Sequence, residues 1–172
     1  GYFRAGDPFV IRHDMQMLAN ADIDFIFFDV TNNYTYLKTA VFKLCEISLE
    51  MREQGIPTPE IAFLSNTRSG RVMNELYDEL YSKGLYQELW FYWQGKPLVM
   101  GKTDDPVLRP EVRDFFTIKR SWAWTESYKE PDHWQWLDHY PQDYGWSKSR
   151  FIPEQISVST AHHPGNPLGK SY

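Results

Sequence analysis

The chain has 172 residues, of which 42% are hydrophobic and 24% are charged, and this ordinary globular composition argues against wholesale disorder. Its formal net charge of −5 argues against a nucleic-acid partner, because nucleic-acid-binding surfaces are normally basic. The single cysteine, Cys45, excludes an intrachain disulfide, and no run of about 18 apolar residues is present to span a membrane.

The first third of the chain predicts a helix, a strand and a second helix. Asp7-Pro8 is typical of a helix start, because aspartate caps free N–H groups and proline fits the first helical position. The run 23–30 is apolar, aromatic and β-branched, as expected of a strand that is buried on both faces. The polar residues 31–33 end this strand, and an apolar stripe then predicts a helix that ends near Gly55.

The rest of the chain continues this alternation. Residues 61–64 predict a buried strand, and an apolar stripe from Val72 to Leu80 predicts the next helix. The segments 89–93 and 96–100, separated by a Gln-Gly turn, predict a pair of strands. Later segments predict a short helix at 110–115, strands at 117–124 and 156–161, and a long loop at 125–151.

Strands that alternate with helices predict an α/β fold with a parallel sheet and helices outside it. About five strands are expected, whereas a (β/α)8 TIM barrel needs eight strands and about 250 residues. The pattern therefore leaves an open α/β sheet and an incomplete barrel as alternatives. No linker-like stretch divides the chain, so we expect residues 1–172 to form a single, partial domain. A chain that starts at Gly1 instead of methionine is expected to be a processed or truncated product.

Ligands of parallel α/β folds collect at the carboxyl ends of the strands, and this rule selects the candidate site residues. The residues at or after the ends of predicted strands include Asp29, Asn32, Asn66, Trp93, Trp124 and His162. Asp29 has two interpretations of similar weight, a cap for the following turn and a catalytic or substrate-anchoring carboxylate. Asn32 and Asn66 are more often turn formers than ligands. Glu154 precedes the last predicted strand, so we expect it at the opposite end of the sheet.

Aromatic residues make up 17% of the chain, and many of them lie outside helix stripes. The predicted loop contains Trp134-Gln135-Trp136-Leu137-Asp138-His139-Tyr140. Sugar rings present apolar C–H faces beside hydroxyl groups, so flat aromatic rings next to polar side chains suit them. Long loops are often functional, and we therefore add Asp138 and His139 to the predicted substrate-binding residues. For aromatic residues within strands, such as Trp90, core packing is the preferred interpretation.

Other chemistries have no clear signature in the sequence. It contains no phosphate-binding glycine loop, Walker pattern or nucleophile elbow, and its histidines have no recognised metal-ligand spacing. We therefore expect neither a cofactor nor a metal. Cys45 lies in a helical pattern, where a buried and inert thiol is the preferred interpretation.

Several segments resemble a family of barrel enzymes. An Asp7-Pro8 helix start leads into Ala21-Asp22-Ile23-Asp24-Phe25 and a strand that ends in Asp29, and the stretches 95–99, 121–124, 136–142 and 157–164 add to the likeness. The chain thereby resembles glycoside hydrolase families 71 and 99, which include microbial endo-acting α-glycanases and α-mannosidases. The resemblance implies a (β/α)8 barrel that hydrolyses an α-linked oligosaccharide or polysaccharide by carboxylate acid/base chemistry. It also implies an exported, bacterial protein.

The chain departs from that family where the catalytic acids are expected. Its relatives are expected to carry them in an Asn-Glu-Trp-type segment on later strands, and this sequence contains no such segment. The resemblance thus implies that the main catalytic acids lie beyond Tyr172, and Asp29 is the best catalytic candidate within the chain. Two further hypotheses stay open: a non-catalytic glycan-binding protein of the same fold, and an unrelated α/β enzyme with a small-molecule substrate.

Overall fold

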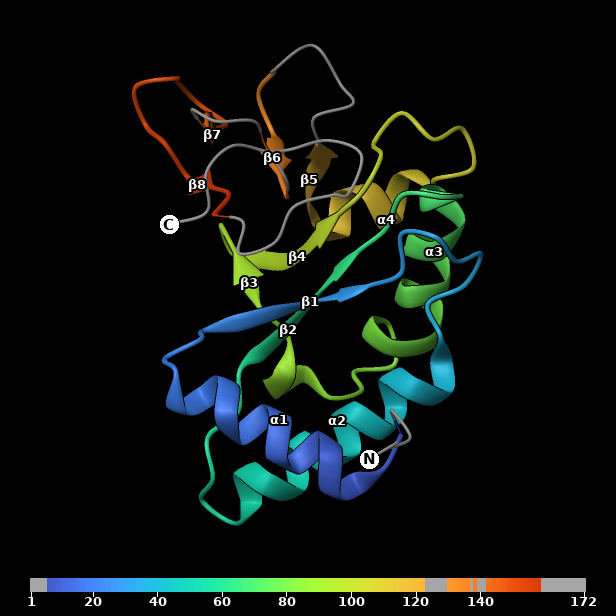
Figure 1. Ribbon diagram of the computed structural model, residues 1–172. Coiled ribbons are helices and arrows are strands. Elements are labelled where there is room, and N and C mark those ends of the chain that lie inside the picture. The colour runs from blue at the N-terminus through green and yellow to red at the C-terminus, as the bar shows by residue number, and fades with distance from the viewer. Residues whose placement is uncertain (1–5, 123–129, 137, 139–141, 159–172) are drawn as a thin grey trace.

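The computed structural model describes residues 6–122, 130–136, 138 and 142–158, in which α-helices lie beside a mostly parallel sheet (Figure 1). The helices are α1 (Pro8–Asn20), α2 (Lys38–Glu53), α3 (Ser69–Leu76) and α4 (Pro110–Phe115), with a π-helical turn at Tyr77–Tyr81 and a 3₁₀ turn at Gln87–Leu89. The strands are β1 (Phe25–Asp29), β2 (Glu60–Leu64), β3 (Tyr92–Trp93), β4 (Lys96–Met100), β5 (Thr117–Trp122), β6 (His133–Gln135), β7 (Tyr144–Gly145) and β8 (Gln155–Ile156). None of the described helices is both long and apolar enough to cross a lipid bilayer.

The predicted α/β fold with a parallel sheet is confirmed. Five parallel strands pair in the order β1-β2-β4-β5-β6. One row of paired residues crosses the sheet through Asp29, Leu64, Met100 and Lys119. Side chains alternate along each strand, so the members of this row point to the same face of the sheet.

The described helices pack on only one face of the sheet. Ile26, Phe63 and Val99 belong to a cluster that includes residues of α2, α3 and α4. The opposite face, which we name the helix-free face, is formed by Phe25, Phe27, Ala62, Leu64, Leu98, Met100 and Trp134. No residue of a described helix belongs to this second apolar cluster. Because no described helix covers the helix-free face, this side of the sheet has room for a pocket.

The start of α1 confirms the predicted cap, whereas β1 is less buried than expected. Asp7 Oδ1 accepts the backbone N–H of Phe9 at 2.9 Å, and proline occupies the first turn of α1. The four apolar residues of β1 are only half-buried. Among the described strands β1 pairs with β2 alone, so it forms an edge of the sheet and is not covered on both sides.

The segment 89–93 forms less strand than the sequence predicts. Only Tyr92–Trp93 pairs with Lys96–Pro97, and this pairing is antiparallel. Gln94 and Gly95 make the connecting turn with φ angles of 54° and 84°, the left-handed values that two-residue hairpins require. Because the hairpin reverses the chain, Trp93 lies at the amino end of the parallel strands. The prediction that Trp93 follows a strand at the carboxyl end is therefore wrong.

The segment predicted as a long loop contains regular structure. β6 pairs in parallel with β5 through Ser121 and Trp134, and β7 forms an antiparallel hairpin with β8. Figure 1 shows this hairpin beside β6, far from α1 and α2. Of the strand predicted at 156–161, only Ile156 belongs to a strand, β8 (Gln155–Ile156), and residues 159–161 lie outside the described part of the chain.

Candidate functional site

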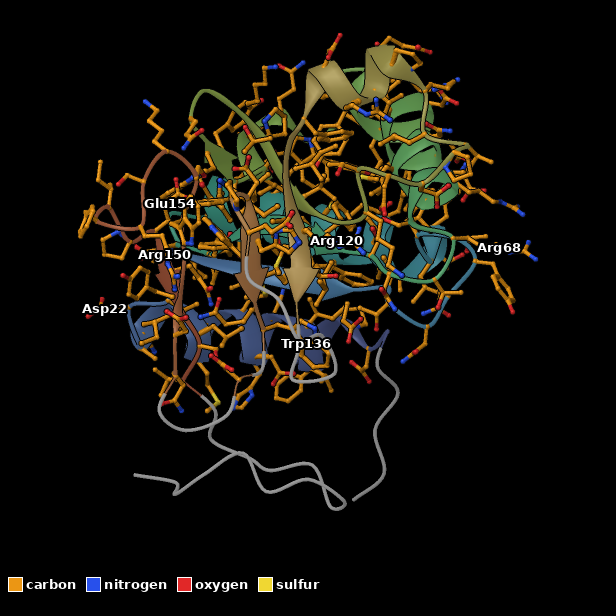
Figure 2. All side chains as sticks on the ribbon, turned by 90° about the horizontal axis from the view of Figure 1, so that it is seen from above. Asp22, Arg68, Arg120, Trp136, Arg150 and Glu154 are labelled. Carbon is orange, nitrogen blue, oxygen red and sulfur yellow. The ribbon has the colours of Figure 1, made fainter. Side chains whose placement is uncertain are left out.

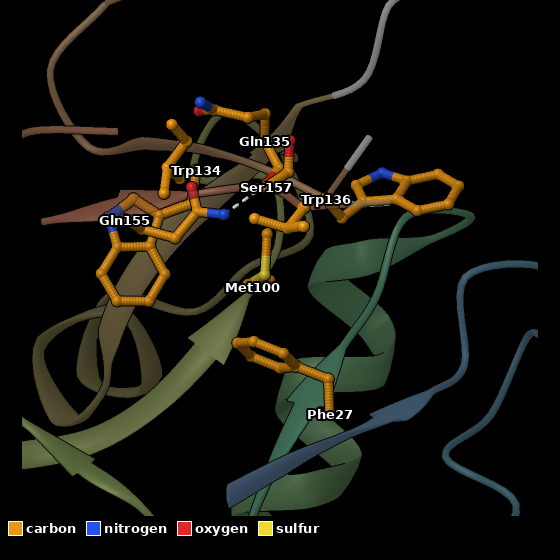
Figure 3. Close-up of a pocket in the computed structure, with 9 residues that line it drawn as sticks. Phe27, Met100, Trp134, Gln135, Trp136, Gln155 and Ser157 are labelled. Carbon is orange, nitrogen blue, oxygen red and sulfur yellow. Dashed lines mark hydrogen bonds between the residues drawn. The ribbon is translucent and has the colours of Figure 1, made fainter. Parts of the chain in front are cut away.

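A pocket of about 280 Å³ opens on the helix-free face of the sheet (Figure 3). It is lined by Phe27, Met100, Trp134, Gln135, Trp136, Gln155, Ile156, Ser157 and Val158. Met100 is the last residue of β4 and Trp136 follows β6, so the pocket lies toward the carboxyl ends of these strands. Its volume is near the lower end of the range of about 300–1,000 Å³ found for small-molecule sites.

Two polar atoms in the pocket wall have no hydrogen-bond partner among the described residues. Ser157 is only 6% exposed and its Oγ is unpaired, and the buried Oε1 of Gln155 is unpaired as well. The side-chain amide of Gln155 donates to the backbone oxygen of Gln135 at 2.7 Å, which leaves its oxygen as the unused group (Figure 3). An unpaired buried polar group costs about 1–3 kcal/mol. Both atoms are buried in the pocket wall, so a ligand hydroxyl group would pair with them only after their side chains turn toward the pocket.

Trp136 supplies an exposed aromatic surface to the same pocket. Trp136 is 45% exposed and is one of the residues that line the pocket. Figure 2 shows Trp136 beyond the carboxyl end of β6, with Glu154 toward the other end of the sheet. An exposed indole beside polar atoms offers a flat apolar surface for stacking together with partners for hydroxyl groups.

Asp29 lies at the edge of the helix-free face. It follows Phe27 by two residues on the same side of β1, and it shares a row of the sheet with Met100. Its side chain is exposed, and its Oδ1 accepts the backbone N–H of Thr31 at 2.8 Å. The turn-capping contact is thus present, and a catalytic role for this carboxylate stays a prediction.

The two predicted asparagines lie in neighbouring loops outside the pocket. Asn32 and Asn66 are both exposed. Their loops are joined by a hydrogen bond of 2.8 Å from the backbone N–H of Thr67 to the backbone oxygen of Thr31. The structure therefore brings the two loops together at the carboxyl ends of β1 and β2, but neither asparagine lines the pocket.

The remaining predicted residues are scattered. Trp93 packs edge-to-face against Trp134, with ring centroids 5.3 Å apart, and does not line the pocket. Asp138 is buried, and its Oδ2 accepts the backbone N–H of Asp143 at 2.8 Å, which fixes the chain before β7. The other three predicted residues, Trp124, His139 and His162, lie outside the described residues.

Sequence reasoning missed a buried ionic cluster on the helix-free face, which we name the Lys119 cluster (Lys119, Asp132, Ser147 and Glu154). The fully buried Nζ of Lys119 donates to Asp132 Oδ1 at 2.8 Å, to Glu154 Oε2 at 2.9 Å and to Ser147 Oγ. Glu154 Oε2 also accepts from Ser147 Oγ at 2.8 Å and from Trp134 Nε1 at 3.1 Å. A buried ammonium group needs such partners, and the only sequence signal was a lysine inside a predicted strand.

The Lys119 cluster favours the ionised form of its carboxylates. Burial by itself would raise the pKa of Glu154, but hydrogen bonds from Lys119, Ser147 and Trp134 outweigh it and bring the pKa below its ordinary value of 4.5. Burial likewise opposes ionisation of Asp132, and its bonds with Lys119 and Ser147 bring the pKa below 3.8. Both carboxylates therefore bind protons more weakly in the folded chain than in the unfolded chain.

This difference predicts a loss of stability in acid. With the Lys119 ammonium group facing both carboxylates, the stabilisation is complete above about pH 5 and is lost as the pH falls through the lowered pKa values of Glu154 and Asp132. Urea unfolding between about pH 7 and pH 3 should show a falling free energy of unfolding, with a shallower fall in Glu154→Gln. Equal slopes in the two proteins would contradict this account of Glu154.

No group of three or more metal-ligating side chains occurs among the described residues. The ring of His133 lies with its Nδ1 3.1 Å from the backbone oxygen of Pro131.

Comparison with known proteins gives no family assignment. The chain matches no protein-family model, and neither curated proteins nor solved structures gave a match. The resemblance to glycoside hydrolase families 71 and 99 therefore stays a prediction. The fold itself, α/β with a parallel sheet of five strands, rests on the structure.

Proposed function

We propose that the pocket on the helix-free face binds a sugar unit of an α-linked glycan, and that the chain contributes to a (β/α)8 barrel glycoside hydrolase. One observation carries the proposal. Trp136 lines the same pocket as Ser157 and Gln155, whose buried Oγ and Oε1 have no hydrogen-bond partner among the described residues. Stacking on an apolar ring face and hydrogen bonding to hydroxyl groups are the two interactions that a sugar makes.

The barrel part of the proposal is supported by the aromatic residues on the helix-free face. Phe25 stacks on Phe91 with centroids 3.7 Å apart, Phe91 lies 6.4 Å from Trp93, and Trp93 lies 5.3 Å from Trp134. Three of these four rings are only half-buried. In a closed barrel, inward side chains of this size fill the interior in layers, so further strands joined at the edge strand β1 would bury them.

The catalytic part of the proposal rests on Asp29. Glycoside hydrolases use two carboxyl groups that flank the scissile bond. Asp29 places an exposed carboxylate at the rim of the face that holds the pocket, in the same row of the sheet as Met100. The second acid is expected on a later strand, as the family resemblance implies.

Replacing Trp136 with alanine tests the proposed binding site. We expect the affinity for the best ligand in a panel of α-mannan and α-glucan oligosaccharides, measured by isothermal titration calorimetry, to fall by at least about tenfold. The matched control is Phe151→Ala, because Phe151 is 95% exposed and does not line the pocket. Equal affinity in wild type and Trp136→Ala would show that the sugar binds elsewhere.

A non-catalytic glycan-binding protein is the alternative function, and the same pocket supports it. The two functions differ in their products. New reducing ends released from a bound α-linked oligosaccharide favour the hydrolase, whereas saturable binding to the complete barrel without new reducing ends favours the binding protein.

A further inference from the structure

The Lys119 cluster and the pocket share one segment of the chain. Residues 155–158, which form one wall of the pocket, directly follow Glu154. Ser147 and Glu154 lie on the loop that joins β7 to β8, whereas Lys119 lies in the middle of β5. The cluster therefore links the β7–β8 hairpin to β5 through Glu154, the residue directly before the pocket wall.

The hairpin also approaches β6 closely through its backbone. Asp132 N–H, directly before β6, donates to the backbone oxygen of Trp146 in the hairpin at 2.8 Å. A Cβ atom on Gly145 would lie 2.5 Å from Trp134 Cδ1. The ionic contacts thus act on a hairpin that rests directly on the ring of Trp134, which itself lines the pocket.

The carboxylate of Glu154 accepts hydrogen bonds from four different parts of the chain. Its Oε2 accepts from Lys119 of β5, from Trp134 of β6 and from Ser147 of the hairpin. Its Oε1 accepts from Gln94 Nε2, in the turn between β3 and β4, at 3.1 Å. Neutralising Glu154 would leave the buried ammonium group of Lys119 with a single carboxylate partner, and removing one member of a buried ion pair is costly.

We propose that Lys119 and Glu154 form a positioning pair that holds the wall 155–158 against the sheet, beside Gln135 and Trp136, which line the same pocket. The part of this inference that concerns ligand affinity rests on the proposed function. The position of the wall does not depend on that function, because it follows from contacts within the chain. The pair acts through the wall and does not itself line the pocket.

Hydrogen exchange of wild type and Glu154→Gln tests the pair without any ligand. We expect backbone amides of residues 144–156 to exchange at least about tenfold faster in Glu154→Gln, while amides of β1 and β2 keep their protection and show that the sheet is folded. Arg150→Gln is the matched control, because Arg150 makes an exposed ion pair of 3.3 Å with Asp143 in the same hairpin. Unchanged exchange of 144–156 in Glu154→Gln would overturn the proposal.

Two further measurements distinguish a positioning role of Glu154 from a general effect on stability. The indole N–H signal of Trp134, which reports its bond to Glu154, should titrate with the carboxyl group in wild type and lose that titration in Glu154→Gln. The affinity for an α-linked mannose trisaccharide should fall at least about tenfold in Glu154→Gln and stay within about twofold in Arg150→Gln. A wild-type protein that binds no glycan refutes the proposed function, whereas the exchange data still decide the positioning pair.

Discussion

Replacing Asp29 with asparagine is expected to lower turnover of an α-linked glycan by about a hundredfold or more, the usual loss when an acid or base catalyst is removed. Asparagine keeps the shape of the side chain, and its Oδ1 can still accept the backbone N–H of Thr31 that Asp29 accepts at 2.8 Å. The fold should therefore be preserved, and glycan affinity should change little. The measurement is release of reducing ends, at saturating substrate, by the longer chain that the proposed barrel requires.

Asp24→Asn is the matched control for this experiment. Asp24 is also an exposed aspartate, but it precedes β1 and so lies at the opposite end of that strand. Its replacement should leave turnover unchanged. Turnover of Asp29→Asn equal to that of wild type would reduce Asp29 to the turn cap that its contact with Thr31 already shows.

Replacing Trp90 with alanine is expected to lower the free energy of unfolding by about 3–5 kcal/mol, the range for truncating a buried aromatic side chain. Trp90 is 2% exposed and lies among Tyr81, Phe63 and Tyr86, at centroid distances of 4.9, 5.8 and 6.3 Å. Its Nε1 also donates to the backbone oxygen of Leu85 at 2.9 Å. The variant leaves a cavity and an unpaired carbonyl, and a domain is stable by only about 5–15 kcal/mol.

Trp136→Ala is the matched control for Trp90→Ala, because it makes the same substitution at an exposed tryptophan. Because Trp136 is 45% exposed, its truncation should cost about 1 kcal/mol or less. Urea unfolding followed by far-UV circular dichroism gives both values on one scale. Similar losses in the two variants would mean that the cluster around Trp90 is not the main core on the helix side of the sheet.

The sequence predicted the elements whose signals are local. Asp7 before a proline, the apolar stripes of the helices and the short apolar run of β2 each identify an element within a few residues. These elements alone lead to the α/β fold. The rule that ligands collect at the carboxyl ends of strands also directed attention to Asp29 and to the aromatic segment that contains Trp136.

The features that the sequence did not predict depend on pairing between distant segments. Trp93 was placed at the wrong end of the sheet because a two-residue hairpin reverses β3 relative to the parallel strands. Glu154 was placed correctly, since it contacts Gln94 at the amino end of β4, but its bond to Lys119 joins residues 35 positions apart. The exposed pocket face of Trp136 and the unpaired Ser157 become visible only when the β7–β8 hairpin lies beside β6.

Titration of ¹⁵N-labelled protein with an α-linked mannose trisaccharide, followed by NMR, tests the central claim most directly. The claim predicts saturable shifts of the Trp136 indole N–H, of the Gln155 side-chain amide and of the Ser157 backbone amide. Signals of residues far from the pocket, such as the indole of Trp90, should stay in place. Absence of shifts across the α-mannan and α-glucan panel, or shifts confined to residues outside the pocket, would contradict the proposal that this face of the sheet binds a sugar.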